Sequence, residues 1–135
     1  MRIYPLVLTG LIFSSAAPAG ELRVYEHNGS IIDWFVADNT IVASYETPRP
    51  GLKEAGIQES SVLFRGLYEG ARISGSAYTF KVGCTAASYQ VTGSQDGKFI
   101  SLHGPAPVRA KKGCAVVGYS QSSPHANLVF IATVP

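Results

Sequence analysis

Hydrophobic and polar side chains alternate along short stretches of this chain, and nearly every stretch ends at a turn sequence. In Tyr78–Gly83, for example, apolar side chains occupy every second position and polar or small residues fill the others. A two-residue period of this kind is typical of a β-strand with one buried face. The predicted strands span residues 22–27, 31–37, 41–46, 61–68, 71–82, 87–93, 98–104, 115–120 and 127–134.

The turn sequences join neighbouring strands into hairpins. Asn28-Gly29 accepts positive φ at both turn positions and therefore closes the first hairpin, and Asp38-Asn39 follows the second strand. Only residues 50–58 have a helical pattern, of at most two turns. Pro50 suits a first helical position and Gly56 suits a C-terminal cap.

About eight to ten short strands with hairpin turns predict an all-β fold, either an antiparallel β-barrel of about eight strands or a β-sandwich. We favour the barrel, because a chain this short cannot easily cover the edges of two open sheets. The strand at 127–134 is apolar on both faces, so we expect it to be central or covered. Four aromatic residues are expected to fill the interior: Trp34, Phe64, Phe80 and Phe130.

The N-terminus has the pattern of a secretory signal. Arg2 precedes an apolar run at Ile3–Phe13 that is too short to span a bilayer, and Ala17-Pro18-Ala19 matches the signal-peptidase pattern. We therefore predict a signal peptide at residues 1–19 and a single domain at residues 20–135. The expected location is the bacterial periplasm or the outside of the cell.

Charge and cysteine content narrow the range of partners. Without Arg2 the chain keeps ten basic and nine acidic residues, a formal charge of +1, which gives no electrostatic reason to expect nucleic acid or a membrane surface. We expect no membrane insertion. In a secreted chain, Cys84 and Cys114 are expected to form a disulfide, which stabilises the fold by roughly 3–4 kcal/mol in the chain-entropy model.

Residues that would carry catalysis or bind a metal are not arranged for either role. The histidines His27, His103 and His125 lack metal-ligand spacing, so we predict no metal and no cofactor. The segment Gly118–Ser122 lacks the second glycine of a nucleophile elbow. The acidic residues fit a solvated outer face better than an acid/base pair. We therefore expect a protein that is not an enzyme.

Two segments remain as candidate recognition sites. Pro48 and Pro50 restrict the backbone on both sides of Arg49. That arginine is then either an exposed recognition residue or part of a stiff corner, paired with a nearby acid. The second segment is Ser74-Gly75-Ser76, which interrupts a strand pattern with small residues. Gly75 is expected to form a bulge there.

The segment Ser74–Tyr78 matches a Ser-Gly-x-x-Tyr signature and resembles the membrane-bound and periplasmic inhibitors of c-type lysozyme, small barrels of Gram-negative bacteria. The resemblance implies a loop that enters the lysozyme cleft, where the family's serine meets the catalytic carboxylates. Ser74, Gly75 and Tyr78 match the signature. Lys81 is a loose match for a lysine of the family's second segment.

These observations lead to two hypotheses from different classes. The first is a periplasmic inhibitor that binds host c-type lysozyme through Ser74, Gly75, Tyr78 and Lys81. The alternative is a non-catalytic envelope barrel that binds a small ligand or has a structural role. A filled interior would leave no cavity, whereas an open one favours ligand binding. The same exposed loop would also serve a homodimer.

Overall fold

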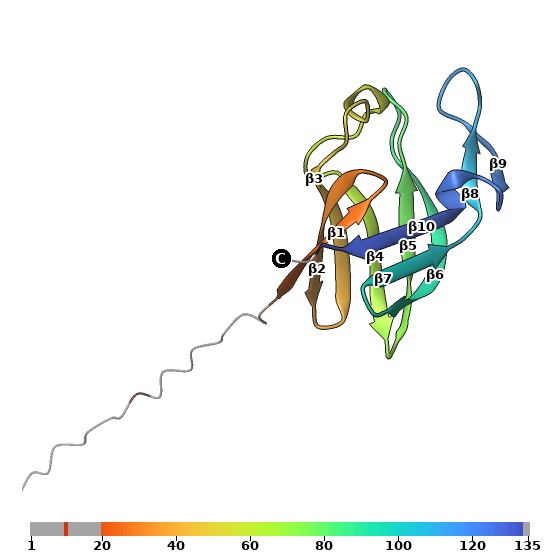
Figure 1. The fold of residues 1–135 in the computed structure, drawn as a ribbon. Helices are drawn as coiled ribbons and strands as arrows, with labels where there is room; N and C mark the ends of the chain where they lie inside the picture. The colour runs from red at the N-terminus through yellow and green to blue at the C-terminus, as the bar shows by residue number, and fades with distance from the viewer. Residues whose placement is uncertain (1–9, 11–19, 134–135) are drawn as a thin grey trace, which may run out of the picture.

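The computed structural model describes Gly10 and residues 20–133, and it has an all-β architecture. Apart from Gly10, the predicted signal peptide lies outside the described residues and stays a prediction. Eight strands form a closed antiparallel barrel in the order β1-β10-β7-β6-β5-β4-β3-β2, which confirms the predicted barrel (Figure 1). The barrel strands are β1 (Glu21–His27), β2 (Ser30–Ala37), β3 (Thr40–Thr47), β4 (Val62–Glu69), β5 (Arg72–Thr79), β6 (Ala87–Asp96), β7 (Phe99–His103) and β10 (Asn127–Ala132).

Two of the hairpin turns have the backbone that their sequences predict. Asn28 and Gly29 have φ of 47° and 83°, and Asp38 and Asn39 have φ of 50° and 63°. Positive φ at both central positions matches the twist of the flanking strands. The segment between β3 and β4 contains η1 (Lys53–Ala55), a single 3₁₀ turn where up to two helical turns were predicted. Gly56, with φ of 92°, caps it as expected.

A two-stranded ribbon outside the barrel was only half predicted. It pairs β8 (Ala106–Arg109) with β9 (Val116–Ser120), and β8 contacts β6. The sequence pattern missed β8, because Pro107 removes a backbone donor and argues against a strand. A two-stranded ribbon has two edges, however, and therefore tolerates a proline. A second 3₁₀ turn, η2 (Pro124–Ala126), leads from the ribbon into β10.

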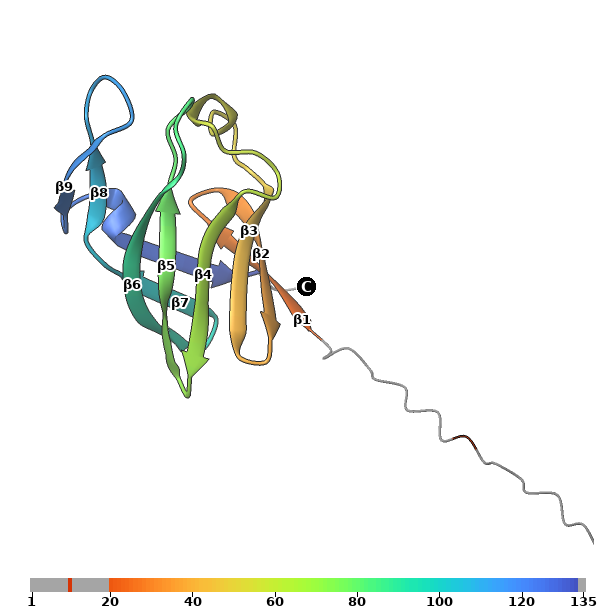
Figure 2. The same ribbon diagram turned by 180° about the vertical axis from the view of Figure 1, so that it is seen from behind.

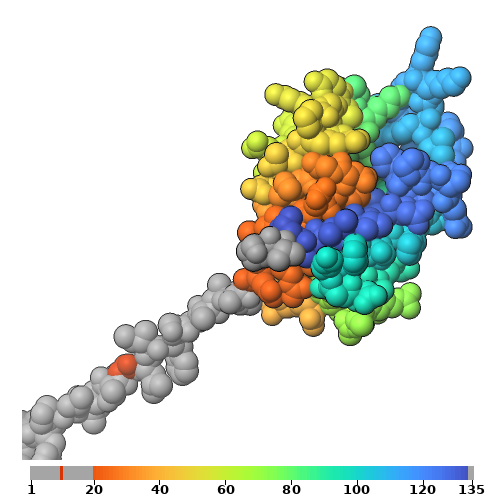
Figure 3. All heavy atoms as spheres, viewed as in Figure 1, coloured from red at the N-terminus to blue at the C-terminus, as the bar shows by residue number. Residues whose placement is uncertain are grey.

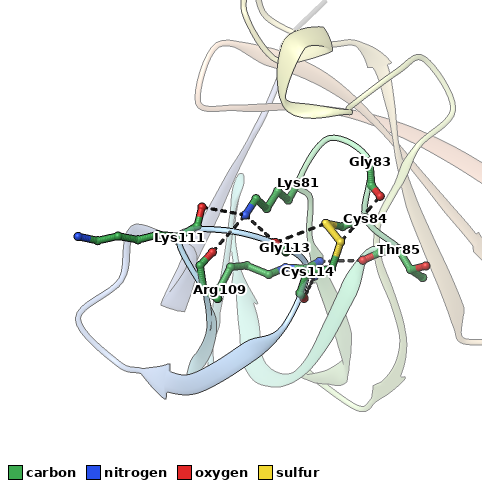
Figure 4. Close-up of a disulfide and its surroundings, with 9 residues drawn as sticks. Lys81, Gly83, Cys84, Thr85, Arg109, Lys111, Gly113 and Cys114 are labelled. Atoms are coloured by element: carbon green, nitrogen blue, oxygen red, sulfur yellow. Dashed lines mark hydrogen bonds between the residues drawn. A yellow bond between two sulfur atoms is a disulfide. The ribbon is translucent and has the colours of Figure 1, made fainter.

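The ribbon is fastened to the 80–86 loop of the barrel by a disulfide and by two basic side chains (Figure 4). Cys84 and Cys114 are bonded, with Cα atoms 5.5 Å apart, which confirms the predicted disulfide. Lys81 Nζ donates to the carbonyls of Gly113 (2.7 Å) and Ala110 (3.1 Å). Arg109 donates to the carbonyls of Cys114 (2.6 Å) and Thr85 (2.7 Å). We call this group of contacts the ribbon clamp.

Aromatic rings fill the middle of the barrel. Trp34, Phe64 and Phe130 have no exposed surface, and the Trp34 ring lies 5.7 Å from Phe64 and 5.3 Å from Phe130, centroid to centroid. Burial of each such side chain stabilises the fold by roughly 1.5–3 kcal/mol. Phe80, which was expected to belong to this layer, is half-buried and lies beyond the end of β5. The outward Val129 and Ile131 of β10 are uncovered, although β10 has a neighbouring strand on each side.

A chain of hydrogen bonds closes one end of the barrel, at the β2–β3, β4–β5 and β6–β7 turns. Trp34 Nε1 donates to Tyr68 Oη (3.1 Å), and Tyr68 Oη donates to Gln95 Oε1 (3.1 Å). Arg23 Nη1 also reaches Gln95 Oε1, at 3.5 Å, and its Nε pairs with Glu21 at 3.1 Å. We call this the closed end, because its inward polar groups are joined to one another.

The predicted bulge at Gly75 is wrong. The register of β5 runs without a shift against β4 and β6. Gly75 lies opposite Gly66, and a Cβ added at Gly75 would lie 2.1 Å from the carbonyl oxygen of Arg65. The glycine therefore permits a close approach of β4 and β5, with no extra residue inserted.

Candidate functional site

The opposite end of the barrel contains a cavity of about 170 Å³. Inward side chains of the barrel strands form its walls, and the segment 48–61 between β3 and β4 covers it. In the space-filling view this yellow segment lies over the upper end of the barrel (Figure 3). We call this end the mouth, the space the mouth cavity and the segment 48–61 the cap.

Two β-bulges shape the mouth. The register shift between β2 and β3 leaves Glu46 as an extra residue, and the shift between β3 and β4 leaves Leu63 as an extra residue. The second bulge allows both Leu63 and the neighbouring Phe64 to be buried. Bulges occur frequently at barrel rims, where they redirect side chains. Both barrel bulges of the described residues lie at the mouth.

Backbone contacts hold the cap in place. Tyr45 N donates to Ser61 O (2.9 Å), and Ser60 N donates to Tyr45 O (2.8 Å). At Gly56 an added Cβ would come within 3.3 Å of the Val82 backbone, so the cap also touches the 80–86 loop. The cap is therefore joined both to β3 and to the loop that the ribbon clamp restrains.

Thr79, the last residue of β5, lines the mouth cavity and carries a buried hydroxyl without a partner. Its side chain faces inward and is 7% exposed, and Oγ1 is buried with no hydrogen-bond partner among the described residues. Leaving a buried hydroxyl unpaired destabilises a protein by about 1–3 kcal/mol. The large majority of buried polar groups in proteins have a hydrogen-bond partner, so the unpaired Thr79 hydroxyl requires an explanation.

His27, at the end of β1, lines the cavity and is 6% exposed. Its ring stacks on Phe130 at 4.7 Å, and Nδ1 lies 2.9 Å from the carbonyl oxygen of Val129. Burial lowers the pKa of His27, and the positive charges of His125 and Arg49 lower it further, against the opposing effect of the Val129 contact. The neutral ring therefore donates from Nδ1 and keeps Nε2 as an acceptor.

Aromatic side chains make up much of the wall. The rings of Tyr45 and Phe80 meet edge to face, with centroids 6.4 Å apart. Tyr89 Oη donates to the carbonyl oxygen of His125 at 2.5 Å. Burial raises the pKa of Tyr45 and of Tyr89 to about 12, so both phenols remain protonated near neutral pH. The aromatic part of the cavity wall is thus uncharged and largely apolar.

Arg49 lies at the entrance. The Arg49 backbone N–H donates to Ser30 Oγ (2.9 Å), and the residue is exposed. It lines the mouth cavity and also a wider hollow of about 780 Å³ on the cap. We place the candidate site in the smaller cavity, because the wider hollow is formed by the single segment 48–59. The prediction that Arg49 pairs with an acid is wrong, since the described residues contain one ion pair, between Arg23 and Glu21.

The structure does not bring the sequence-predicted site residues together. Ser74 and Gly75 lie in the middle of β5, between β4 and β6, so the predicted protruding loop is wrong (Figure 2). Ser74 borders an outer groove between these strands. Tyr78 contributes to the mouth cavity, and Lys81 belongs to the ribbon clamp. A regular ladder on both sides of β5 leaves no free backbone with which to form a loop.

Sequence reasoning missed Thr79, Tyr45 and Tyr89 as site residues. One signal was available for Thr79. The inward face of β5 runs through Ile73, Gly75 and Ala77, and Thr79 is the first hydroxyl on that face. The bulges, which decide where the cavity lies, have no comparable signal in the sequence.

The arrangement offers a cavity with aromatic and aliphatic walls and a few polar groups. Among Gly10 and residues 20–133, no cluster of three or more His, Cys, Asp or Glu side chains is suited to hold a metal ion. In the same part of the chain, no helix has the length and the apolar character needed to cross a membrane. No protein-family model, no curated protein and no solved structure matches this chain.

Proposed function

We propose that the protein is a non-catalytic binding protein of the cell envelope that holds a small molecule in the mouth cavity. The observation that supports this best is the buried Thr79 hydroxyl, which lacks a partner among the described residues and belongs to a residue that lines the cavity. A ligand group that pairs with this hydroxyl would remove the penalty of leaving it unpaired. Small-molecule sites typically combine apolar walls with a few polar groups, and barrel mouths are a common place for them.

The rest of the interior supports the same location. The rings of Trp34, Phe64 and Phe130 occupy the middle of the barrel, and the hydrogen-bonded chain occupies the closed end. A ligand inside the barrel therefore has the mouth as its place. The cap would shield it from water.

A ligand-observed NMR screen of small molecules against the purified protein tests this function. Ala55 lines the cavity from the cap side, so Ala55→Leu should partly fill the cavity and abolish binding of the hits. Ala71→Leu, at an exposed turn of the closed end, is the matched control and should keep binding. The proposal fails if no compound binds, or if Ala55→Leu binds the hits as well as the wild type does.

The second candidate is inhibition of a c-type lysozyme by the outer wall of the barrel. Arg65 lies opposite Ser76 in the β4–β5 register, and both border the groove of about 370 Å³ that Ser74 also lines. A retaining glycosidase carries two carboxyl groups about 5 Å apart, which a hydroxyl and a cation would satisfy through charge-assisted hydrogen bonds. Arg65 would take the part first assigned to Lys81, because the Lys81 ammonium is engaged by carbonyls of the ribbon.

A cell-wall lysis assay with added protein tests this candidate. Inhibition should disappear in Ser74→Ala and in Arg65→Gln, while the melting temperature stays within a few degrees of the wild-type value, as expected for surface substitutions. Undiminished lysis at high micromolar protein would exclude the inhibitor function.

A further inference from the structure

We infer that the ligand of the mouth cavity is a small organic anion built on one ring, an aromatic monocarboxylate. Its carboxylate would meet Arg49 and Thr79, and its ring would lie against the aromatic wall. This inference rests on the proposed small-molecule function and adds the chemical class of the ligand.

The size of the cavity suits a ligand with a single ring. The volume is about 170 Å³. An apolar protein cavity of about 150 Å³ accommodates a benzene molecule, whereas drug-sized ligands occupy roughly 300–1,000 Å³. A six-membered ring fits this space, and its polar substituent would extend toward the entrance.

The walls favour a flat apolar body. Tyr45, Phe80 and Tyr89 contribute rings, and Leu63 and Leu128 add aliphatic surface. The edge-to-face geometry of Tyr45 and Phe80 is one that a third aromatic ring can extend. A strongly polar molecule would leave these surfaces without a matching contact.

The charge that lines the mouth cavity favours an anion. Among the described residues that line the cavity none is acidic, while Arg49 is cationic. The described residues give Arg49 no carboxylate partner, because their one ion pair lies at the closed end. A cleft lined by charge of one sign concentrates ligands of the opposite sign, and the planar arginine fork pairs with carboxylates in a bidentate manner.

The unpaired hydroxyl completes the recognition of a carboxylate. Thr79 is 7% exposed, its Oγ1 has no partner, and it lines the same cavity as Arg49. A hydroxyl can donate to a carboxylate oxygen, and hydrogen bonds to charged groups are stronger than those between neutral groups. In the proposed complex the ligand carboxylate would pair with both groups.

Isothermal titration of the purified protein with matched ligands tests the ligand class. The probes are benzoate, its neutral counterpart benzamide, benzylammonium and acetate. Benzoate should bind about tenfold more tightly than benzamide, the difference expected of one charge-assisted contact. Acetate, which lacks the ring, and benzylammonium, which has the opposite charge, should bind more weakly than both.

Variants assign the preference to its residues. Arg49→Gln should abolish the preference for benzoate, because benzoate binding weakens more than benzamide binding does. Arg72→Gln, at an exposed arginine of the closed end, should keep the preference. Equal binding of benzoate and benzamide, or a preference that survives in Arg49→Gln, overturns the anion class but leaves the small-molecule function standing. No binding by any of the four probes also overturns the inference, whereas the function fails only with the wider screen.

Discussion

The two ends of the barrel are built from the same strands, yet they differ in how completely their inward polar groups are paired. At the closed end, Trp34, Tyr68 and Gln95 pass hydrogen bonds from one to the next. At the mouth, the Thr79 hydroxyl is buried without a partner beside an open cavity. Among the described residues, the buried side-chain atoms without a partner are Thr79 Oγ1 at the mouth and Arg109 Nε in the ribbon clamp. Because an unpaired buried group lowers stability, their location indicates a demand other than stability there.

The ends also differ in how they are covered. The closed end needs only tight turns, whereas the mouth carries the cap, two bulges and the ribbon clamp. The contacts that restrain the loops are thus concentrated at the mouth, where the cavity leaves the packing least complete. Substitutions at either end should therefore change stability by different amounts and with different signs.

Removing the disulfide should have the largest effect. In the Cys84→Ala/Cys114→Ala variant, we expect the free energy of unfolding to fall by about 3–4 kcal/mol, because the unfolded chain loses a loop constraint. Urea unfolding measures the loss. Hydrogen exchange of the variant should show a larger loss of protection for amides of the cap and of the 80–86 loop than for amides of the closed end.

Ser120→Ala/Ser122→Ala, at an exposed hydroxyl pair beside the same ribbon, is the control and should leave stability within about 0.5 kcal/mol of wild type. Equal loss of protection at both ends would contradict the local role of the ribbon clamp.

Breaking the closed end should be the next largest change. Tyr68→Phe leaves the fully buried Trp34 Nε1 without its acceptor, so we expect a loss of about 1–3 kcal/mol in unfolding free energy. Denaturant unfolding gives the value. Tyr119→Phe, where the side chain is 64% exposed, should change it by less than about 0.5 kcal/mol. If Tyr68→Phe does not change the unfolding free energy, this chain of hydrogen bonds does not stabilise the closed end.

The corresponding replacement at the mouth should have the opposite sign. Thr79→Val keeps the shape and removes the unpaired hydroxyl, so we expect the protein to be more stable by up to about 1 kcal/mol. Thermal unfolding of the ligand-free protein measures it, with the exposed Thr92→Val as control. Destabilisation by Thr79→Val would show that the hydroxyl is satisfied and would remove the contrast between the ends.

The smallest effect concerns pH. Burial lowers the pKa of His27 below its ordinary value of 6.5, so the unfolded state binds more protons than the folded state as the pH falls through that value. The free energy of unfolding should therefore have its full value above pH 6.5, decline below pH 6.5 and level off below the pKa of His27 in the folded state. Unfolding free energies measured across this range should show the slope in wild type and in the exposed-site control His103→Gln. His27→Gln should reduce it. An unchanged slope in His27→Gln would assign the effect to other groups.

Much of the barrel could be predicted because strand alternation and hairpin turns are local. Asn28-Gly29 and Asp38-Asn39 determine turn geometry within two residues, and Trp34 and Phe64 mark the inward face of their strands. Pro107 made β8 hard to predict, because a strand tolerates a proline only where one of its sides has no partner strand. That is a property of the assembled sheet.

The candidate site was harder to predict. Ser74 and Gly75 look like an irregular loop in the sequence, but the Gly66–Gly75 pairing makes them part of a continuous strand. The mouth cavity depends on Leu63 and Glu46 as bulge residues, which only the register of neighbouring strands defines. Arg49 was recognised as unusual, although its position at the entrance follows from where the cap crosses the barrel.

The all-β class, the hairpins, the disulfide pair and the aromatic filling of the barrel are predictable from the sequence, because they follow from period, turn chemistry and cysteine count. Which end is closed and which is open becomes visible only in the folded barrel. That difference depends on pairing between strands distant in the chain, which joins Trp34 to Tyr68 at one end and leaves Thr79 without a partner at the other. Non-local register cannot be read from local pattern, and in this protein it places the candidate site.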